Sequence, residues 1–319
     1  MSAGRHDGKG RRRKKGGRGE KAMVPDAEFT SYYGKPILNP PVWKASDVAM
    51  YLFLGGLAGA GSLLAAGAQL TGRPVAARAL KLSSLAAIGG STAALIHDLG
   101  RPARFANMLR VMKPTSPMSV GSWLLAAYGP AAGAAAVLDV TGLFSRLGGT
   151  ATASAAALGP AVATYTAVLV ADTAVPAWHE GHRELPFVFV GSAAGAAAGM
   201  ALVAAPVRET GPMRTVAVLG AAVELAAAKS LERRAGMAAE PYKTGKAGRF
   251  VRAGEILSVA GAAGGALLGG RKRGAAALSG AALLAGSACT RFGVFYAGMQ
   301  SARDPKYTVV PQRERVAAG

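Results

Sequence analysis

The sequence predicts an all-α integral membrane protein with eight transmembrane helices, arranged as two four-helix bundles. Hydrophobic residues make up 51% of the 319 residues, and glycine alone contributes 44. Eight apolar stretches each approach the ~20 residues that a helix needs to cross the hydrocarbon core of a bilayer. Most charged residues lie between these stretches. These three observations are typical of a multi-pass membrane protein.

The eight predicted spans follow one another with short connections. In chain order they are residues 48–71, 79–97, 117–139, 150–175, 186–206, 213–230, 252–270 and 274–296. Small residues spaced four apart, as at Gly55 and Gly59, favour close packing between such helices. Residues 53–59 of the first span resemble residues 189–195 of the fifth, which indicates two halves related by a parallel repeat. Chance similarity between glycine- and alanine-rich helices is the alternative.

The segments outside the transmembrane domain, residues 47–296, differ in character. Residues 1–24 are rich in glycine, lysine and arginine, which predicts a disordered basic tail that touches anionic lipid headgroups. Residues 25–46 carry aromatic residues and several prolines, which predicts an extended N-terminal arm. Residues 297–319 are expected to form a C-terminal cytoplasmic tail.

The net charge of +20 informs the topology of the chain. A strongly basic protein could bind nucleic acid, but the basic residues lie in loops between spans, so we expect no nucleic-acid partner. With eight spans both termini lie on one side of the membrane. That side carries 28 of the 37 lysine and arginine residues. The positive-inside rule therefore predicts cytoplasmic termini in the cell inner membrane.

The loop between the second and third predicted spans is strongly basic. Its apolar residues Phe105, Met108, Leu109 and Met112 recur at helical spacing, and Pro102 suits a first helical turn. This pattern predicts a short amphipathic helix on the membrane surface, with an ordinary basic loop as the alternative. The charged residues of the segment are candidates for docking a partner: Asp98, Arg101, Arg104, Arg110 and Lys113.

The cysteine and histidine content limits the cofactors of this chain. Cys289 is the only cysteine, so the chain alone can form no disulfide and ligate no iron–sulfur cluster. A haem held between helices needs histidine ligands within the spans. The four histidines lie in the tail, at helix ends or in a loop, so no haem is expected. No protein metal site is evident either.

Ionisable residues within membrane spans are costly and usually functional. In this chain they gather toward the cytoplasmic ends of the predicted spans. They are Asp47, Tyr51, His97, Asp98, Tyr165, Asp172, Glu224, Glu255 and Arg291. A polar site in one leaflet is what a proton-coupled reaction on a lipid-soluble substrate needs, because the oxygens of the substrate must be hydrogen-bonded and protons must reach them from water.

Each of these residues also has a structural explanation. Asp47 could be a helix N-cap. His97 and Asp98 could end a helix and bind Arg101. The Tyr165 hydroxyl could bind a backbone carbonyl, and Asp172 could pair with Arg291. Glu255 could be interfacial. Glu224 is the hardest to explain structurally, because it lies deepest in a predicted span.

Several blocks of the sequence resemble the NrfD/PsrC family, the membrane subunits of polysulfide-reductase-type molybdoenzyme complexes. The blocks occur in the order of the family between residues 43 and 300. They are Trp43 with residues 50–59, residues 97–105, 115–123 and 165–169, residues 185–192, and residues 291–298.

The resemblance implies a haem-free quinone subunit of eight helices that docks an iron–sulfur, ferredoxin-like subunit, which connects to a molybdopterin catalytic subunit. The quinone, with menaquinone as the expected type, would bind near that interface. The tyrosine of the family's quinone site falls on Tyr165, where this chain has Ala167 in place of the usual glycine. Asp47 and Tyr51 occupy the start of the first span, which supplies polar quinone contacts in some members. His97 completes the candidate quinone-binding set.

The sequence therefore predicts a quinone-reactive membrane anchor of an oxidoreductase. Tyr165 would hydrogen-bond a quinone oxygen, while Asp172 and Glu224 relay protons and Arg291 tunes their charge. Two other functions remain open. A secondary transporter or proton channel could use the same acids, although their clustering toward one face argues against it. A purely structural anchor would hold soluble subunits at the bilayer without any quinone.

Overall fold

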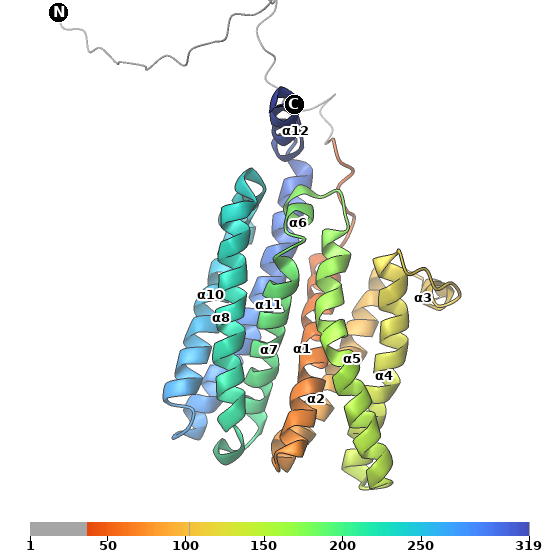
Figure 1. Cartoon of the computed structure of the whole chain (residues 1–319), viewed down its shortest axis with the longest axis vertical. Coiled ribbons are helices and arrows are strands. Elements are labelled where there is room, and N and C mark those ends of the chain that lie inside the picture. Colours follow the sequence, from red (N-terminus) through yellow and green to blue (C-terminus); the bar gives the residue numbers. More distant parts are fainter. Residues whose placement is uncertain (1–36, 102, 319) are drawn as a thin grey trace, which may run out of the picture.

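The computed structural model describes residues 37–101 and 103–318, and within them it contains helices and no strands. The predicted basic tail, most of the predicted arm and Pro102 lie outside the described residues. The long helices are α1 (Ala45–Leu70), α2 (Pro74–Asp98), α4 (Pro117–Thr141), α5 (Ser145–Ala171), α7 (Leu185–Ala204), α8 (Gly211–Arg234), α10 (Gly245–Leu267) and α11 (Arg273–Arg303). They run side by side along the long axis of the molecule (Figure 1).

Shorter helices connect or extend the long ones. They are α3 (Ala103–Met108), α6 (Pro176–Glu180), η1 (Val207–Glu209), η2 (Gly236–Ala239), α9 (Glu240–Lys243) and α12 (Lys306–Ala318). Several helices begin with proline in the first turn, as at Pro74 and Pro117, where the missing N–H costs no hydrogen bond. Gly142 adopts φ 69° and ends α4 in the left-handed region that glycine accepts most easily.

Seven of the described helices are long and apolar enough to cross a membrane, namely α1, α2, α4, α5, α7, α10 and α11. Helix α8 is 24 residues long, but its last turns carry Lys229, Glu232, Arg233 and Arg234, which lower its hydropathy. The all-helical membrane class is thus confirmed. The finer expectation of eight spans in two bundles stays a prediction.

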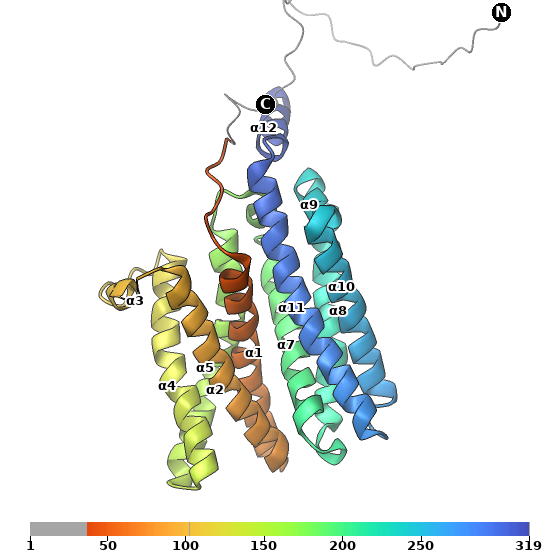
Figure 2. The same ribbon diagram turned by 180° about the vertical axis from the view of Figure 1, so that it is seen from behind.

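The long helices contact one another in two similar sets. Helix α1 packs on α2 and α5, and α4 packs on both α2 and α5; in the same way α7 packs on α8 and α11, and α10 packs on both. Contacts of α1 with α7 and α11, and of α5 with α7, join the two sets (Figures 1 and 2). Helices α1 and α7, which carry the similar glycine segments, hold the same position in each set.

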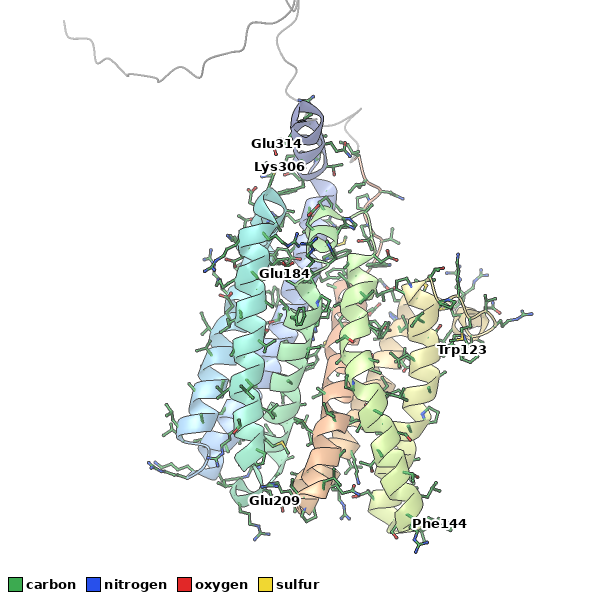
Figure 3. All side chains as sticks on the ribbon, viewed as in Figure 1. Trp123, Phe144, Glu184, Glu209, Lys306 and Glu314 are labelled. Atoms are coloured by element: carbon green, nitrogen blue, oxygen red, sulfur yellow. The ribbon has the colours of Figure 1, made fainter. Side chains whose placement is uncertain are left out.

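The helices alternate in direction, so the described ends of the chain lie at one end of the bundle (Figure 2). We call this the termini end. Figure 3 shows Glu184 and Lys306 toward this end and Glu209 and Phe144 at the opposite end. The basic loop with α3 and the connection through α6 also lie at the termini end.

Backbone-to-backbone contacts between glycines set the spacing of several helices. A Cβ on Gly59 of α1 or on Gly159 of α5 would overlap the other glycine's carbonyl oxygen. Gly191 of α7 and Gly220 of α8 form a similar crossing, in which an added Cβ would lie 2.6–2.7 Å from the facing carbonyl oxygen. Only glycine permits such approaches, so these contacts fix where the helices cross.

A pair of tryptophans joins the two helix sets at the termini end. Trp43, just before α1, stacks on Trp178 of α6 with ring centroids 5.7 Å apart. The Trp178 Nε1–H donates to the carbonyl of Val294 on α11 at 2.7 Å. Tyr242 donates its hydroxyl proton to the carbonyl of Ala177, also in α6, at 3.0 Å. The connection between α5 and α7 is therefore packed into the bundle.

The C-terminal segment, for which the sequence predicts a cytoplasmic tail from residue 297, is helical over most of its described length. Helix α11 continues to Arg303, and α12 follows after the break at Asp304 and Pro305. Residues 297–303 contain no proline, so nothing in them ends the helix. Tyr307 of α12 is buried, and Lys306 pairs with Glu240 at 2.9 Å. Hydrogen bonding to that carboxylate raises the pKa of Lys306.

We predict that Gly298→Ala will destabilise the protein. The Cβ of alanine would overlap the indole of Trp178, and the rigid ring has nowhere to move. Such overpacking costs about 1–3 kcal/mol of the free energy of unfolding. Thermal unfolding of the purified protein in detergent measures this loss. Gly274→Ala in the same helix is the control, because no atom lies within 4 Å of its added Cβ. Equal stability of both variants would contradict the prediction.

We also predict that the stability supplied by Glu184 depends on pH. Arg234 donates from Nε and Nη2 to the two carboxylate oxygens at 2.7 Å each, and these bonds lower the pKa of Glu184. A carboxyl whose pKa is lower in the folded than in the unfolded protein stabilises the fold. This contribution is fully present above the unfolded-state pKa of about 4.3, and it is lost as the pH falls through the folded-state pKa.

Glu184→Gln should therefore lower the free energy of unfolding by about 1–2 kcal/mol at pH 7, and the gap to the parent protein should narrow as the pH falls through the folded pKa of Glu184. Unfolding curves recorded over a series of acidic pH values measure it. Glu180→Gln is the matched control, because Glu180 meets the same arginine at 3.9 Å with a more exposed side chain. A gap that is independent of pH would rule out the ionic origin.

Candidate functional site

An internal cavity of about 120 Å³ lies among α1, α2, α4 and α5 near the termini end. Tyr51 and Leu52 of α1 and Asp98 of α2 form part of its wall. Tyr165 of α5 forms another part. Trp43, Leu95, Leu99, Met108, Met118 and Ser122 also line it. Most of these side chains are apolar, so the cavity has a hydrophobic lining with a few polar atoms.

A larger groove of about 720 Å³ runs between α4 and α5. Its apolar wall includes Val120, Leu124, Ala161 and Val168. Polar side chains gather near the C-terminal end of α5, where Asp172, His179 and His182 line the groove. The His182 Nδ1 lies 2.9 Å from the carbonyl oxygen of His179, and the two rings are 6.0 Å apart between centroids.

Tyr165 lines both the internal cavity and the groove, which makes it the residue that the two spaces share. Its ring packs on Gly121 of α4, where an added Cβ would overlap the ring. The described residues provide no hydrogen-bond partner for its hydroxyl, so the alternative explanation of Tyr165, a bond to a backbone carbonyl, is not found among them. Asp172 follows the last residue of α5 and lines the groove with Tyr165, which confirms that these two predicted residues share a face.

The predicted residues Asp47 and His97 meet each other rather than the cavity. The His97 Nδ1 lies 2.8 Å from the Asp47 Oδ2, and this contact links the first turn of α1 to the last turn of α2. His97 is largely exposed, whereas the Asp47 side chain is mostly covered. Neither residue lines the groove or the internal cavity. Asp47 is not the N-cap of α1, because Lys44 holds that position.

Glu224 and Arg291 lie together in the core of the second helix set. The Glu224 Oε1 accepts a hydrogen bond from Thr290 at 2.6 Å, and its Oε2 accepts one from Ser258 at 3.1 Å. Arg291 is fully buried and donates from Nη2 to the carbonyl of Phe189 at 2.8 Å. Its guanidinium carbon lies 3.7 Å from the centroid of the Phe189 ring.

This buried cluster is separate from the groove. Neither Glu224 nor Arg291 lines the groove or the cavity beside Tyr165. Asp172 is exposed in the groove, and it does not pair with the fully buried Arg291, so the structural explanation for Asp172 fails. The predicted site residues thus fall into three groups: the Tyr165 region, the Asp47–His97 contact and the Glu224–Arg291 cluster.

Ionisable side chains also occur toward the opposite end, which corrects the expectation that they gather on one side only. Lys81 of α2 is buried and bonds to Asp139 of α4 at 2.8 Å and to Gln69 at 2.6 Å. Arg78 binds the same carboxylate at 2.8 Å. Helix α2 begins at Pro74, before the predicted start at residue 79, so Arg78 lies within the helix rather than in a loop.

The predicted docking segment forms a short helix with a smaller apolar stripe than expected. Helix α3 ends at Met108, and Met112 lies beyond it and is 66% exposed. Met108 lines the internal cavity, so this helix covers the cavity from the side. Arg101, Arg104, Arg110 and Lys113 are exposed around it. Asp98 differs from them, because it lines the cavity.

The sequence reasoning missed His179 and His182 as site residues. It treated them only as poor haem ligands because they lie at a helix end or in a loop. Their spacing of three residues places both rings beside Asp172, directly after the predicted fourth span. Paired histidines at the exposed end of an apolar groove are a recognisable signal for proton exchange, because an imidazole ring can both accept and donate a proton.

Comparison with known proteins adds one finding. A family model described as "Polysulphide reductase, NrfD" matches residues 37–228, which is more than half of the chain. No curated protein matches the chain. The matched range includes the internal cavity, the groove and Glu224, and it ends before Arg291.

We predict that Glu224→Ala will lower the free energy of unfolding by about 1–3 kcal/mol, because the buried hydroxyl of Ser258 loses its acceptor and that of Thr290 keeps only the Gly286 carbonyl at 3.1 Å. Glu224→Gln keeps an acceptor oxygen and should cost less. Thermal unfolding of the two variants provides the measurement, with Glu314→Ala on the exposed face of α12 as the control. If Glu224→Ala were as stable as its control, the cluster would have no structural role.

Proposed function

This chain belongs to the NrfD family of membrane subunits of oxidoreductase complexes, and from that premise we propose that it exchanges electrons between a membrane quinone and a peripheral iron–sulfur subunit. The quinone, of the menaquinone type, would bind beside Tyr165. The iron–sulfur subunit, of the ferredoxin-like type, would pass electrons to or from a molybdopterin catalytic subunit.

The observation that carries this proposal is the position of Tyr165 between a lipid-facing groove and an internal cavity. Ligand sites for small molecules usually enclose about 300–1,000 Å³ and combine apolar walls with a few polar groups. The groove has about 720 Å³ and such a lining. The Tyr165 hydroxyl can donate to a quinone carbonyl or accept from a quinol hydroxyl, which fixes the ring for electron transfer.

Oxidation of a quinol releases two electrons and two protons. In our proposal the electrons leave to the iron–sulfur subunit, and Asp172 takes up protons at the exposed end of the groove, from which they reach water. Reduction of a quinone reverses these steps. Glu224 and Arg291 form a second, buried proton-exchanging pair in α8 and α11. Tyr51, Asp47 and His97 lie on the far side of Tyr165 and support the start of α1.

We further propose that α8 is the eighth span, since it has the length of a span and packs between α7 and α10. The two sets of four helices would then be the two predicted bundles. Both termini would face the cytoplasm, and the exposed basic residues around α3 would contact the iron–sulfur subunit there. The chain itself would hold no haem and no iron–sulfur cluster.

The proposal predicts that Tyr165→Phe and Asp172→Asn will each slow quinol oxidation by the purified complex. Loss of the phenol should reduce turnover roughly tenfold, because one hydrogen bond to the reacting oxygen is worth about 1.5 kcal/mol. Loss of the carboxylate should reduce turnover by a factor of about 10²–10⁴ if it is the proton acceptor. Measurement of quinol oxidation rates with a soluble electron acceptor tests both.

Ala157→Trp on the exposed face of α5, outside the groove, serves as the control for general damage to this helix. Unchanged rates in both site variants would refute the assignment of the site. The absence of any quinone dependence in the parent complex would favour the purely structural anchor. Ion or solute transport by the chain alone would favour the transporter.

A further inference from the structure

The groove between α4 and α5 has the form of a surface channel along two helices. On α4 it is lined by Pro117, Val120 and Leu124, which recur at intervals of three and four residues and therefore share one face. On α5 the lining runs from Ala161 to Asp172. Val120 is 38% exposed and Val168 is 46% exposed, so the groove opens on the outer surface of the helix pair.

The groove is polarised along its length. Eleven residues separate Ala161 from Asp172, which corresponds to about 16 Å along the helix axis. That length is about half of the ~30 Å hydrocarbon core, or one leaflet. Its polar end carries Asp172, His179 and His182, and its apolar end carries Leu124 and Ala161. A molecule that fills it must have a polar head and an apolar tail.

The volumes of the internal cavity and of the groove indicate which of them can hold a quinone with its tail. The internal cavity of about 120 Å³ is smaller than the range of ligand sites, so a two-ring quinone with its tail cannot fit there. The groove of about 720 Å³ is large enough. Tyr165 lines both spaces, so a ring that lies against Tyr165 must leave its tail on the groove side.

Gly121 gives Tyr165 its place between these spaces. The tyrosine ring packs directly on the α carbon of Gly121, and any larger residue there would overlap it. Gly121 and Val120 are neighbours in α4. The backbone of α4 at Gly121 contacts the tyrosine ring, and the Val120 side chain lines the groove. The ring thus forms the inner wall of the groove.

We propose that the groove between α4 and α5 is the entrance for a prenylated quinone, which slides in sideways from the lipid of one leaflet, stops with its ring against Tyr165 and keeps its isoprenoid tail along Val120, Leu124 and Ala161. This inference rests on the proposed quinone function and adds the route and the tail site. The internal cavity behind Tyr165 remains free of the tail and gives the ring space to adjust.

Equilibrium binding to the full-length protein in lipid nanodiscs tests the proposal. The probes are radiolabelled menadione, which has a naphthoquinone ring and no tail, and a menaquinone with four isoprene units. The variant Ala161→Trp places an indole in the apolar end of the groove, about 6 Å along the helix from Tyr165. The control Ala157→Trp places the same indole one turn away, on an exposed part of α5 that does not line the groove.

We expect Ala161→Trp to weaken binding of the tailed quinone at least about tenfold, because displacing even two methylene groups from apolar contact costs that much. Menadione binding should change less than twofold, and Ala157→Trp should bind both probes as the parent protein does. Folding of Ala161→Trp is checked by its retained menadione binding.

Three results would overturn the inference. Unchanged binding of the tailed quinone by Ala161→Trp would show that the tail lies elsewhere. Equal weakening of both probes would show that the groove holds the ring rather than the tail. Displacement of a spin-labelled phospholipid by Ala161→Trp, with quinone binding unaffected, would assign the groove to a lipid acyl chain. If the parent protein bound neither probe, the proposed function itself would fail, which is a distinguishable outcome.

Discussion

The architecture depends on how closely α1 and α5 approach each other at Gly59 and Gly159. Each glycine leaves room for the other's carbonyl oxygen, so the two backbones touch without intervening side chains. In lipid no hydrophobic effect drives helices together, and such close packing supplies the attraction instead. Tyr165 lies six residues after Gly159, or about 9 Å along the axis. The crossing therefore fixes the height and direction of the tyrosine between the cavity and the groove.

The two helix sets place polar groups in different settings. In the first set, Tyr165, Asp172 and the two histidines line spaces that a ligand can reach. In the second set, Glu224 bonds to two hydroxyls and Arg291 bonds to a backbone carbonyl, all away from these spaces. Among the described residues, the Nε and Nη1 atoms of Arg291 are buried without a hydrogen-bond partner, and its guanidinium packs on the Phe189 ring. The two sets therefore have similar helix contacts but differ in their polar groups: those of the first set line a groove and a cavity, and those of the second set are buried in the core.

The sequence was sufficient to predict the helical membrane class and the alignment of Tyr165 with Asp172, because both follow from local periodicity. It could not predict contacts between distant segments, such as His97 with Asp47 or Trp43 with Trp178. Hydropathy also misplaced helix ends. The predicted second span began at residue 79, whereas α2 begins at Pro74, because Arg78 reads as a loop residue when its partner Asp139 is unknown. The continuation of α11 past residue 296 depends on packing against α6.

The length of α11 has a mechanical consequence. Its 31 residues extend about 46 Å, against a hydrocarbon thickness of about 30 Å, so the helix is longer than a membrane span by about a third of its length. Figure 2 shows α11 ending at about the height of the neighbouring α9–α10 corner and carrying α12 beyond it. A partner that docked on this end would meet an off-centre projection, formed by the end of α11 and by α12, rather than a flat surface. Such a projection would limit how the partner could be rotated about the long axis of the bundle.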